Sequence, residues 1–215
     1  VAGRIGWMDR YEHYILAATA GTAAVMIGAA GAGQMARGAL LALLGVTAVM
    51  YQNSLTGRGQ WAPAAFRNQT VQMARFAVDY AKGPVAVNDI GYMVYYSPDY
   101  VLDMWGLASR AALDMRLDPD PPPAWAAPLA ERNGVELAMI YDAWLADAPG
   151  EEWVRLGRLD LVGPAGQLAD RQVSFYATSP QAAPRLRKLL EDFVPTLPPG
   201  AAFTFDRPKE GQQDG

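Results

Sequence analysis

The chain has 215 residues with a formal net charge of −4, and it contains one histidine and no cysteine. The acidic balance argues against nucleic acid as a partner, because no basic stripe is present to neutralise phosphates. The lack of cysteine excludes disulfides and thiolate metal sites. The single histidine, His13, excludes a histidine-built metal site or a Ser-His-Asp triad in the soluble part. No metal ion or cofactor is expected.

Charged residues are missing from two long stretches near the start of the chain. Residues 13–36 and 38–57 contain no Asp, Glu, Lys or Arg, whereas charges recur every few residues after Arg58. The mean hydropathy of −0.01 therefore averages two unlike parts. A soluble protein rarely concentrates its uncharged sequence in this way, so the pattern favours a membrane-inserted region followed by a soluble domain.

Two apolar runs in this region, residues 14–32 and 39–54, are predicted to be membrane-spanning helices. About 20 helical residues cross a hydrocarbon core of about 30 Å, so the first run is long enough and the second is rather short. Small residues in the first run suit close packing of helices in lipid. Residues 33–38 are predicted to form a tight turn, and Tyr51 falls where an interfacial aromatic residue would lie.

Other interpretations of the apolar region fit the sequence less well. A signal peptide is not predicted, because the region is about twice too long and is interrupted by Gln34 and Arg37. A buried hairpin in a soluble protein is an alternative, but nothing downstream looks large enough to bury it. In a membrane hairpin Arg37 lies alone on one side, which agrees with an extracytoplasmic soluble domain on the other. The chain begins in mid-motif at Val1, so we interpret it as a fragment of a longer polypeptide, although processing or an alternative start would give the same residue.

The sequence after the membrane region alternates between helical and strand-like segments. A helix is predicted from Asn68, which would cap it, to a stop at Gly83-Pro84. This alternation favours a parallel sheet with helices packed on it. Further helical segments are predicted at residues 92–96, 107–117, 124–133 and 183–193, and strands at residues 85–87, 100–105 and 135–141.

The predicted fold class is α/β, a transmembrane helical hairpin followed by a small α/β domain with a mostly parallel sheet. Two strand-like runs, residues 153–162 and 171–178, are joined by the turn sequence Gly-Pro-Ala-Gly-Gln and predict a carboxyl-terminal hairpin. The predicted boundaries are residues 1–57 for the membrane-entry segment and helical hairpin, 58–206 for the soluble domain and 207–215 for a disordered polar tail.

The most distinctive local sequence lies where the first predicted strand ends at Asn88 and Asp89, and Gly91 then allows a sharp turn into a short helix. Ligands of open α/β sheets bind at the carboxyl ends of parallel strands. Asn88 and Asp89 are therefore candidate substrate-binding residues. The alternative is that Asp89 caps the following helix through its carboxylate. Asp103 falls inside a predicted strand, where pairing with an arginine is the favoured role.

Arg10 lies just before the first apolar run, at a depth where a cation can pair with a lipid phosphate. It is a third candidate substrate-binding residue, for the phosphate of a lipid-linked donor. The alternative pairs Arg10 with Glu12 or other neighbours and makes Trp7 and Tyr11 interfacial anchors. No catalytic residue is assigned.

Four short motifs spread over most of the chain resemble one known family. They are Gly-Trp-Met-Asp-Arg-Tyr-Glu at residues 6–12, Asn-Asp-Ile-Gly at 88–91, Val-Leu-Asp-Met-Trp-Gly-Leu at 101–107 and Glu-Leu-Ala-Met-Ile-Tyr-Asp-Ala-Trp at 136–144. This pattern resembles the soluble carboxyl-terminal domain of bacterial GT-C type integral membrane glycosyltransferases. These enzymes are relatives of the dolichyl- or undecaprenyl-phosphate-sugar dependent mannosyl- and arabinosyltransferases.

The resemblance implies a polytopic enzyme of the inner or plasma membrane that builds the cell envelope. It would move a sugar from a lipid-phosphate carrier to an acceptor on the extracytoplasmic face. In such enzymes the catalytic carboxylate lies in the first extracytoplasmic loop, which has no counterpart here. This part is therefore expected to give acceptor binding or structural support. Its expected partners are membrane lipid, a polyprenyl-phosphate-sugar donor and the remainder of its own chain.

Two other functions are weighed against the glycosyltransferase. The first alternative is a membrane-anchored, non-catalytic binding or scaffolding module, which the same apolar region would anchor. The second is a soluble Rossmann-like enzyme, which ranks low. Residues 28–38 are rich in glycine, but they lie within apolar sequence and lack a preceding β-branched strand.

Overall fold

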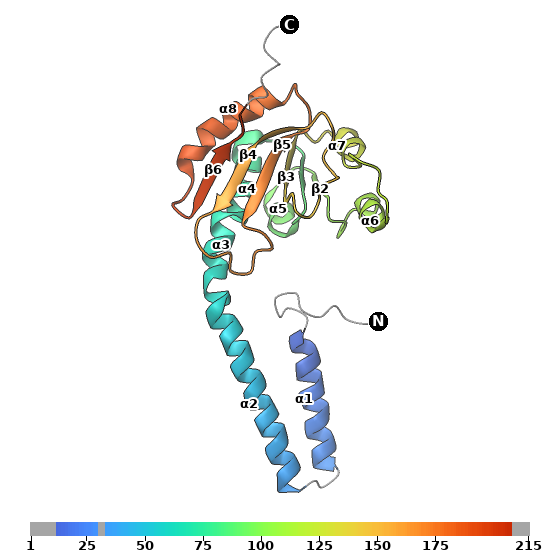
Figure 1. Cartoon of the computed structure of the whole chain (residues 1–215), viewed down its shortest axis with the longest axis vertical. Coiled ribbons are helices and arrows are strands. Elements are labelled where there is room, and N and C mark those ends of the chain that lie inside the picture. The colour runs from blue at the N-terminus through green and yellow to red at the C-terminus, as the bar shows by residue number, and fades with distance from the viewer. Residues whose placement is uncertain (1–11, 30–32, 208–215) are drawn as a thin grey trace. The chain divides into compact units, whose positions relative to one another are not determined.

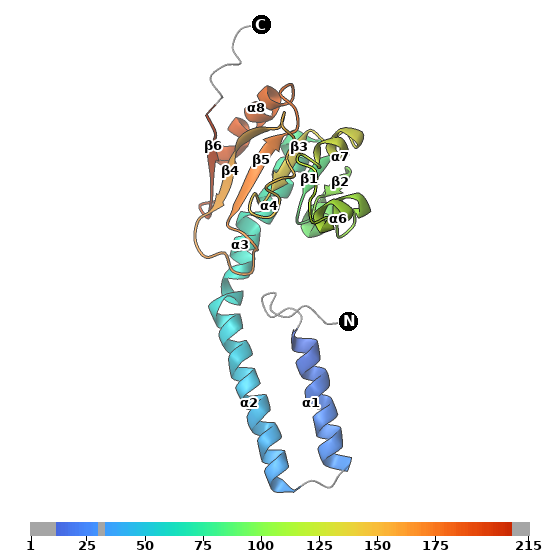
Figure 2. The same ribbon diagram turned by 45° about the vertical axis from the view of Figure 1, so that its right-hand side comes forward.

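The computed structural model describes residues 12–29 and 33–207, and the chain divides into two compact units, residues 1–62 and 63–215. The first unit is helical, and the second combines a sheet with helices (Figures 1 and 2). Arg10 and residues 208–215 of the predicted tail lie outside the described residues. The expectations for them stay predictions.

The first unit contains two helices that run side by side in opposite directions, α1 (Glu12–Ala29) and α2 (Gln34–Gly57), followed by the short η1 (Gly59–Trp61). Within the described residues, one helix is long and apolar enough to cross a membrane. It covers Gln34–Asn53 of α2, with 20 residues and a mean hydropathy of 1.3. The apolar part of α1, Ala17–Ala29, is shorter. The structure thus supplies one candidate span where two were predicted.

The turn predicted at residues 33–38 is wrong for most of its length, because α2 begins at Gln34. The carbonyl of Gly33 accepts hydrogen bonds from the backbone N–H groups of Ala36 and Arg37, at 3.2 and 3.4 Å. Gln, Met, Ala and Arg are all good helix formers. The predicted turn residues therefore lengthen the second helix, which is why α2 is long enough to span although residues 39–54 alone are short.

Two threonine hydroxyls in the long helices are hydrogen-bonded within the helices themselves. The hydroxyl groups of Thr22 and Thr47 donate to the carbonyls of Ala18 and Leu43, at 2.8 and 2.9 Å. Such bonds hide a hydroxyl from an apolar solvent. The large aliphatic side chains of α2 are exposed in the chain by itself. They are Met35, Leu41, Leu43, Leu44, Val46, Val49 and Met50.

The second unit is built on one six-stranded sheet with the order β2-β1-β3-β5-β4-β6. Its strands are β1 (Val85–Val87), β2 (Val101–Asp103), β3 (Leu137–Ile140), β4 (Val154–Leu161), β5 (Gln172–Ala177) and β6 (Ala201–Phe205). Only the β1–β2 and β1–β3 pairs are parallel, and the β3–β5, β4–β5 and β4–β6 pairs are antiparallel. The sheet is therefore mixed, and the prediction of a mostly parallel sheet is wrong.

The mixed sheet has a simple cause in the connections. After β3, within the described residues, no helix connects one strand to a parallel neighbour. The structure confirms the predicted hairpin of β4 and β5, and β5 pairs antiparallel with β3. The strand that sequence reasoning missed, β6, then pairs with β4 after the last helix. Its alternating pattern was present in the sequence, since Phe203 and Phe205 turn towards the core while Ala202 and Thr204 are exposed.

Eight helical segments accompany the sheet in the described part of the chain after η1. They are α3 (Ala62–Asn68), α4 (Thr70–Arg75), η2 (Phe76–Ala81), α5 (Gly91–Tyr96), α6 (Arg110–Leu117), α7 (Ala127–Arg132), α8 (Ala183–Phe193) and η3 (Val194–Thr196). The prediction that Asn68 begins a helix is wrong, because Asn68 ends α3. Its buried side chain lies against Gly200, where a Cβ atom would be 1.8 Å from Asn68 Nδ2. Its amide serves a tertiary contact and caps nothing.

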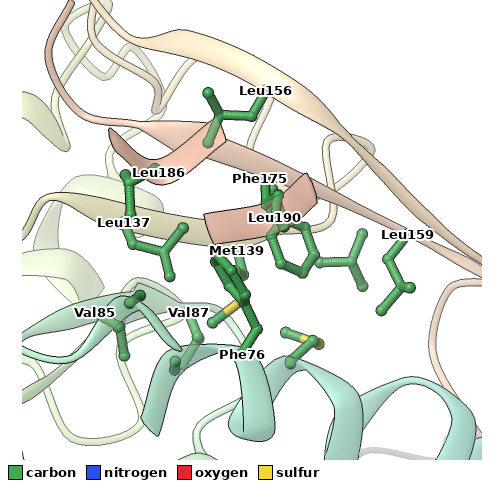
Figure 3. Packing of buried hydrophobic residues seen from close by; sticks show 14 of the residues in the cluster. Phe76, Val85, Val87, Leu137, Met139, Leu156, Leu159, Phe175, Leu186 and Leu190 are labelled. Carbon is green, nitrogen blue, oxygen red and sulfur yellow. The ribbon is translucent and has the colours of Figure 1, made fainter. Parts of the chain in front are cut away.

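Two hydrophobic cores lie on the two faces of the sheet. The first core joins η2 and α8 to one face, and Figure 3 shows Phe76, Met139, Phe175 and Leu190 gathered in it. The second core joins α6 and α7 to the opposite face of β1, β2 and β3, through residues such as Ala138. Because side chains alternate along a strand, neighbouring residues of β1 and β3 enter different cores.

Phe76 is the side chain whose loss we expect to cost the first core most. It is fully buried and its ring centroid lies 5.7 Å from that of Phe175 and 5.3 Å from that of Phe193. Phe76→Ala should lower the free energy of unfolding by about 3–5 kcal/mol. Guanidinium titration of the detergent-solubilised chain, followed by near-ultraviolet circular dichroism, measures this change. Leu117→Ala is the control, since Leu117 is 65% exposed and should change stability by less than about 0.5 kcal/mol. Equal losses in both variants would contradict the assignment.

Candidate functional site

The chain adds β2 on one side of β1 and then crosses over to add β3 on the other side. The order of strand addition therefore reverses between β1 and β3, which are parallel. The chain passes from β1 to β2 through α5, which packs on the first core through Met93, and from β2 to β3 through α6 and α7, which pack on the second. Both crossovers join parallel strands, and β1 lies between β2 and β3. Open α/β sheets bind ligands at the carboxyl ends of the strands where such a reversal occurs. Asn88, Asp89, Tyr141 and Asp142 follow β1 and β3 at this edge.

Asn88 links β1 and β3 at their carboxyl ends. Its side chain is 3% exposed, and its Oδ1 atom accepts a hydrogen bond from the backbone N–H of Tyr141 at 2.9 Å. The Nδ2 atom of the same amide is buried and has no hydrogen-bond partner in the described part of the chain. A buried donor without a partner costs about 1–3 kcal/mol, so an acceptor from water or from a ligand would be stabilising here.

Asp89 is exposed beside Asn88, in the loop before α5. It does not cap that helix, because the N-cap residue is Ile90 and no side-chain hydrogen bond is made there. No hydrogen bond or ion pair to the Asp89 carboxylate occurs among the residues that the structure describes. Helix α5 begins at Gly91, one residue before its predicted start at residue 92, so the residue that precedes it is Ile90. The carboxylate of Asp89 is therefore available to solvent and to ligands.

Tyr141 connects this edge to the helical segment that contains Gln69. Its side chain is almost fully buried, and its hydroxyl donates to Gln69 Oε1 at 3.0 Å. Gln69 Nε2 in turn donates to the carbonyl of Asp170 at 3.0 Å. Burial raises the pKa of Tyr141 far above its ordinary value, and the negative charges of Asp89 and Asp170 raise it further. Tyr141 is therefore a neutral hydrogen-bond donor with a structural role.

Asp142, the next residue, lies at the centre of a polar cluster. The cluster is on the face of β5 that carries Ser174 and Tyr176, opposite the face that carries Phe175. The two carboxylate oxygens of Asp142 accept from the hydroxyls of Ser174 at 2.5 Å and Tyr176 at 2.9 Å. Arg155 Nη1 approaches the same carboxylate at 3.4 Å, while Arg155 Nε binds Asp206 at 2.6 Å. Burial, followed by the charge and hydrogen bond of Asp142, raises the pKa of Tyr176 to about 12. The cluster is internally paired, and we assign it to holding β3, β4 and β5 in place.

Two tryptophans meet near the ends of β2 and β3. The ring centroids of Trp105 and Trp144 are 4.6 Å apart, and that of Trp144 lies 5.4 Å from the ring of Tyr141. The guanidinium of Arg116 lies 4.1 Å from the centroid of Trp105 and donates to the Trp105 carbonyl. These contacts make Trp105 and Trp144 packing residues at this edge.

Asp103 pairs with no arginine of the described ranges, so the expectation of such a pair is wrong. Its buried carboxylate accepts four backbone N–H groups from the loop that follows β2, at 2.5–3.3 Å. The donors are Trp105, Gly106, Ala108 and Ser109. Gly106 has a φ of 84°, and a Cβ atom there would lie 2.6 Å from Leu113 Cα, so glycine is required for this turn.

Sequence reasoning found part of this edge and missed part of it. The candidates Asn88 and Asp89 lie next to each other in one loop. The structure adds Tyr141, which is a neighbour of both. The signal for Tyr141 was available, because it follows the third strand as Asn88 follows the first. Gln69 and Asp170 carried no signal, since only the fold brings these distant residues together. In the described ranges no group of three or more His, Cys, Asp or Glu side chains is arranged to hold a metal ion.

Residues 59–176 match the family described as a domain of unknown function, DUF8728. This match covers more than half of the 215 residues. The chain belongs to this family. The DUF8728 region extends from η1 into β5 and so includes β1, β2, β3 and the candidate edge, but it leaves out α1, α2, α8 and β6. No curated protein and no solved structure gave a match to the chain.

The four hydrogen bonds of Asp103 predict a large effect of removing its charge. Asp103→Asn would present an amide N–H₂ group to backbone donors and leave buried N–H groups unpaired, so the free energy of unfolding should fall by about 3 kcal/mol. Chemical denaturation measures this loss. Asp114→Asn is the matched control, because Asp114 is an exposed partner of Arg110 in an (i, i+4) pair and should contribute less than about 0.5 kcal/mol. A loss in Asp103→Asn no larger than in the control would overturn the loop assignment.

The buried Tyr141 and the half-buried Tyr176 predict instability in alkali. Their raised pKa values mean that above pH 10 the unfolded chain loses protons which the folded chain keeps, so the stability present below pH 10 should fall as the pH rises towards about 12. In Tyr176→Phe the fall should be less steep, and in Tyr100→Phe, at an exposed position, it should be unchanged. Denaturant titrations across this pH range, with tyrosinate absorbance followed in parallel, test the expectation. An identical pH dependence in all three proteins would refute it.

Proposed function

We propose that this chain is the carboxyl-terminal part of a membrane glycosyltransferase that uses a polyprenyl-phosphate-sugar donor. In this proposal the helical unit attaches the chain to the inner or plasma membrane, and the α/β unit lies on the extracytoplasmic side. The α/β unit binds the acceptor at the edge formed by Asn88 and Asp89, or supports that binding. The base that activates the acceptor hydroxyl belongs to another part of the protein.

The observation that carries the proposal is the position of the Asn-Asp-Ile-Gly motif. This motif contributed to the resemblance with GT-C type enzymes, and it lies where the chain reverses between β1 and β3. Asp89 offers an exposed carboxylate there, and Asn88 offers a buried amide donor that has no partner within residues 12–29 and 33–207. The second motif has a different role, because Asp103 and Gly106 build the loop after β2.

The chemistry of this edge suits a saccharide. A carboxylate accepts hydrogen bonds from vicinal hydroxyl groups, and an amide N–H₂ group donates to a hydroxyl or ring oxygen. Bonds to an ionised group contribute more than neutral ones, so Asp89 would supply most of the orientation energy. The carboxylate would hold an acceptor sugar and take no proton from it. This division of labour is consistent with a catalytic base elsewhere in the protein.

Support for membrane attachment comes from the helical unit. Residues Gln34–Asn53 have the length and composition of a span, and the hydroxyl of Thr47 in this stretch is bonded to its own helix. The proposed partners are membrane lipid, a polyprenyl-phosphate-sugar donor and the remainder of the protein. The alternative, a membrane-anchored binding module without catalysis, shares the same edge and the same helix.

Asp89→Asn in the full-length protein tests the proposal. The change keeps the shape of the side chain and removes its charge, which should weaken acceptor binding by about 1.5–3 kcal/mol, or about tenfold or more. The expected result is a raised KM for the acceptor with a nearly unchanged kcat, because the interaction is made equally in the bound and transition states. Membranes supplied with radiolabelled undecaprenyl-phosphate mannose or arabinose provide the assay.

Asp120→Asn is the matched control, because Asp120 is an exposed carboxylate in the loop between α6 and α7. Its kinetics should equal those of the unchanged protein, and circular dichroism should show that both variants are folded. Unchanged KM and kcat in Asp89→Asn would remove Asp89 from acceptor binding. Saccharide binding that depends on Asp89 without any sugar transfer would favour the anchored binding module instead.

A further inference from the structure

Four aromatic side chains form a connected cluster on the surface of the α/β unit. We call Phe66, Tyr92, Tyr95 and Tyr96 the aromatic patch; Phe66 belongs to α3 and the tyrosines belong to α5. The ring centroid of Tyr92 lies 5.3 Å from that of Phe66, 6.5 Å from that of Tyr95 and 5.5 Å from that of Tyr96. The patch therefore joins two elements into one surface.

Most of the aromatic patch is exposed, and its tyrosines lie in an uncharged stretch of sequence. Tyr95 is 85% exposed, and Tyr96 and Phe66 are about equally exposed at 40% and 39%. Residues 90–98, which contain all of α5, include no charged side chain. Helix α5 turns Met93 into the core, packs the half-buried Tyr92 against it and leaves Tyr95 and Tyr96 exposed. A contiguous exposed aromatic surface of this kind marks a contact with a partner or a membrane.

The position of the aromatic patch in the chain favours lipid as that partner. Phe66 lies thirteen positions after Asn53, the end of the candidate span, and the residues between them are largely helical. A helical link of this length extends at most about 20 Å, so the chain tethers the patch within about that distance of the end of the candidate span. Arg67, exposed beside Phe66, can pair with a lipid phosphate there.

We infer that the aromatic patch rests in the headgroup region of the bilayer, with the tyrosine and phenylalanine rings among the lipid headgroups. Aromatic rings with a polar tip prefer this zone, because the ring leaves water while the hydroxyl stays hydrated. The inference rests on the membrane attachment proposed above. The position of the patch also bears on where the ligand would bind, because α5 begins two residues after Asp89. The candidate edge is then held near the membrane surface, where a lipid-linked or membrane-attached saccharide would be found.

The chain contains no cysteine, so single labels can be placed without a background signal. Three variants of the full chain, Tyr95→Cys, Val49→Cys and Glu131→Cys, each receive the fluorophore NBD and are reconstituted into vesicles of phosphatidylcholine and phosphatidylglycerol. Val49 reports on the candidate span in α2, and Glu131 is an exposed residue of α7 near the amino end of β3. Lipid with a doxyl group near the headgroup quenches labels at the membrane, and iodide quenches labels in water.

The expected result is a loss of fluorescence with doxyl lipid for the Tyr95 and Val49 labels, and a loss with iodide for the Glu131 label. A Tyr95 label quenched by iodide and not by lipid, together with a lipid-quenched Val49 label, would overturn the aromatic-patch inference alone. If neither label is quenched by lipid, membrane attachment fails and both proposals fall. An effect of Asp89→Asn on acceptor KM is read separately, so the failure of each proposal is distinguishable. Circular dichroism of each labelled variant establishes that it is folded.

Discussion

Strands β1 and β3 lie side by side and are buried on both faces, and the arrangement of the α/β unit follows from this constraint. Successive side chains of a strand point to opposite faces, so a strand buried on both faces needs packing partners on each side. Ala86 and Ala138 meet the α6–α7 layer, while larger neighbours such as Val87 and Met139 meet η2 and α8. The connections between the parallel strands must therefore cover both faces of the sheet. The order of strand addition reverses between β1 and β3 as a result.

This reversal places the candidate site. The residues that follow β1 and β3 meet at one edge, where the Asn88 amide accepts a bond from the backbone of Tyr141 and keeps a donor that is unpaired among the described residues. Two motif carboxylates near this edge have opposite environments. Asp103 is buried and bound by four backbone N–H groups, whereas Asp89 is exposed. A single distinctive stretch of sequence thus combines a structural carboxylate with one that is available to a ligand.

The apolar surfaces of the two units differ in chemical kind. In α2 the exposed side chains are mainly aliphatic, as suits hydrocarbon, and the hydroxyl of Thr47 is bonded inside the helix. On the α/β unit the exposed cluster at α3 and α5 is aromatic, as suits the headgroup region. The bilayer hydrocarbon and its headgroup region favour different side chains. This difference is the basis for the different depth in the bilayer that we propose for each surface.

The sequence by itself determined the features that depend on local pattern. The strands after Gly83-Pro84 and at residues 135–141, the hairpin of β4 and β5, and the helix at residues 183–193 were all readable from periodicity and turn residues. Asn88 and Asp89 were found because polar residues directly follow a buried strand. The tertiary structure decided the features that depend on distant partners. Strand direction is set by which edge a strand joins, so the sheet became mixed once β5 paired with β3. The role of Asp103 was likewise decided by the loop that folds around it, because a buried carboxylate takes whichever donors the fold brings within reach.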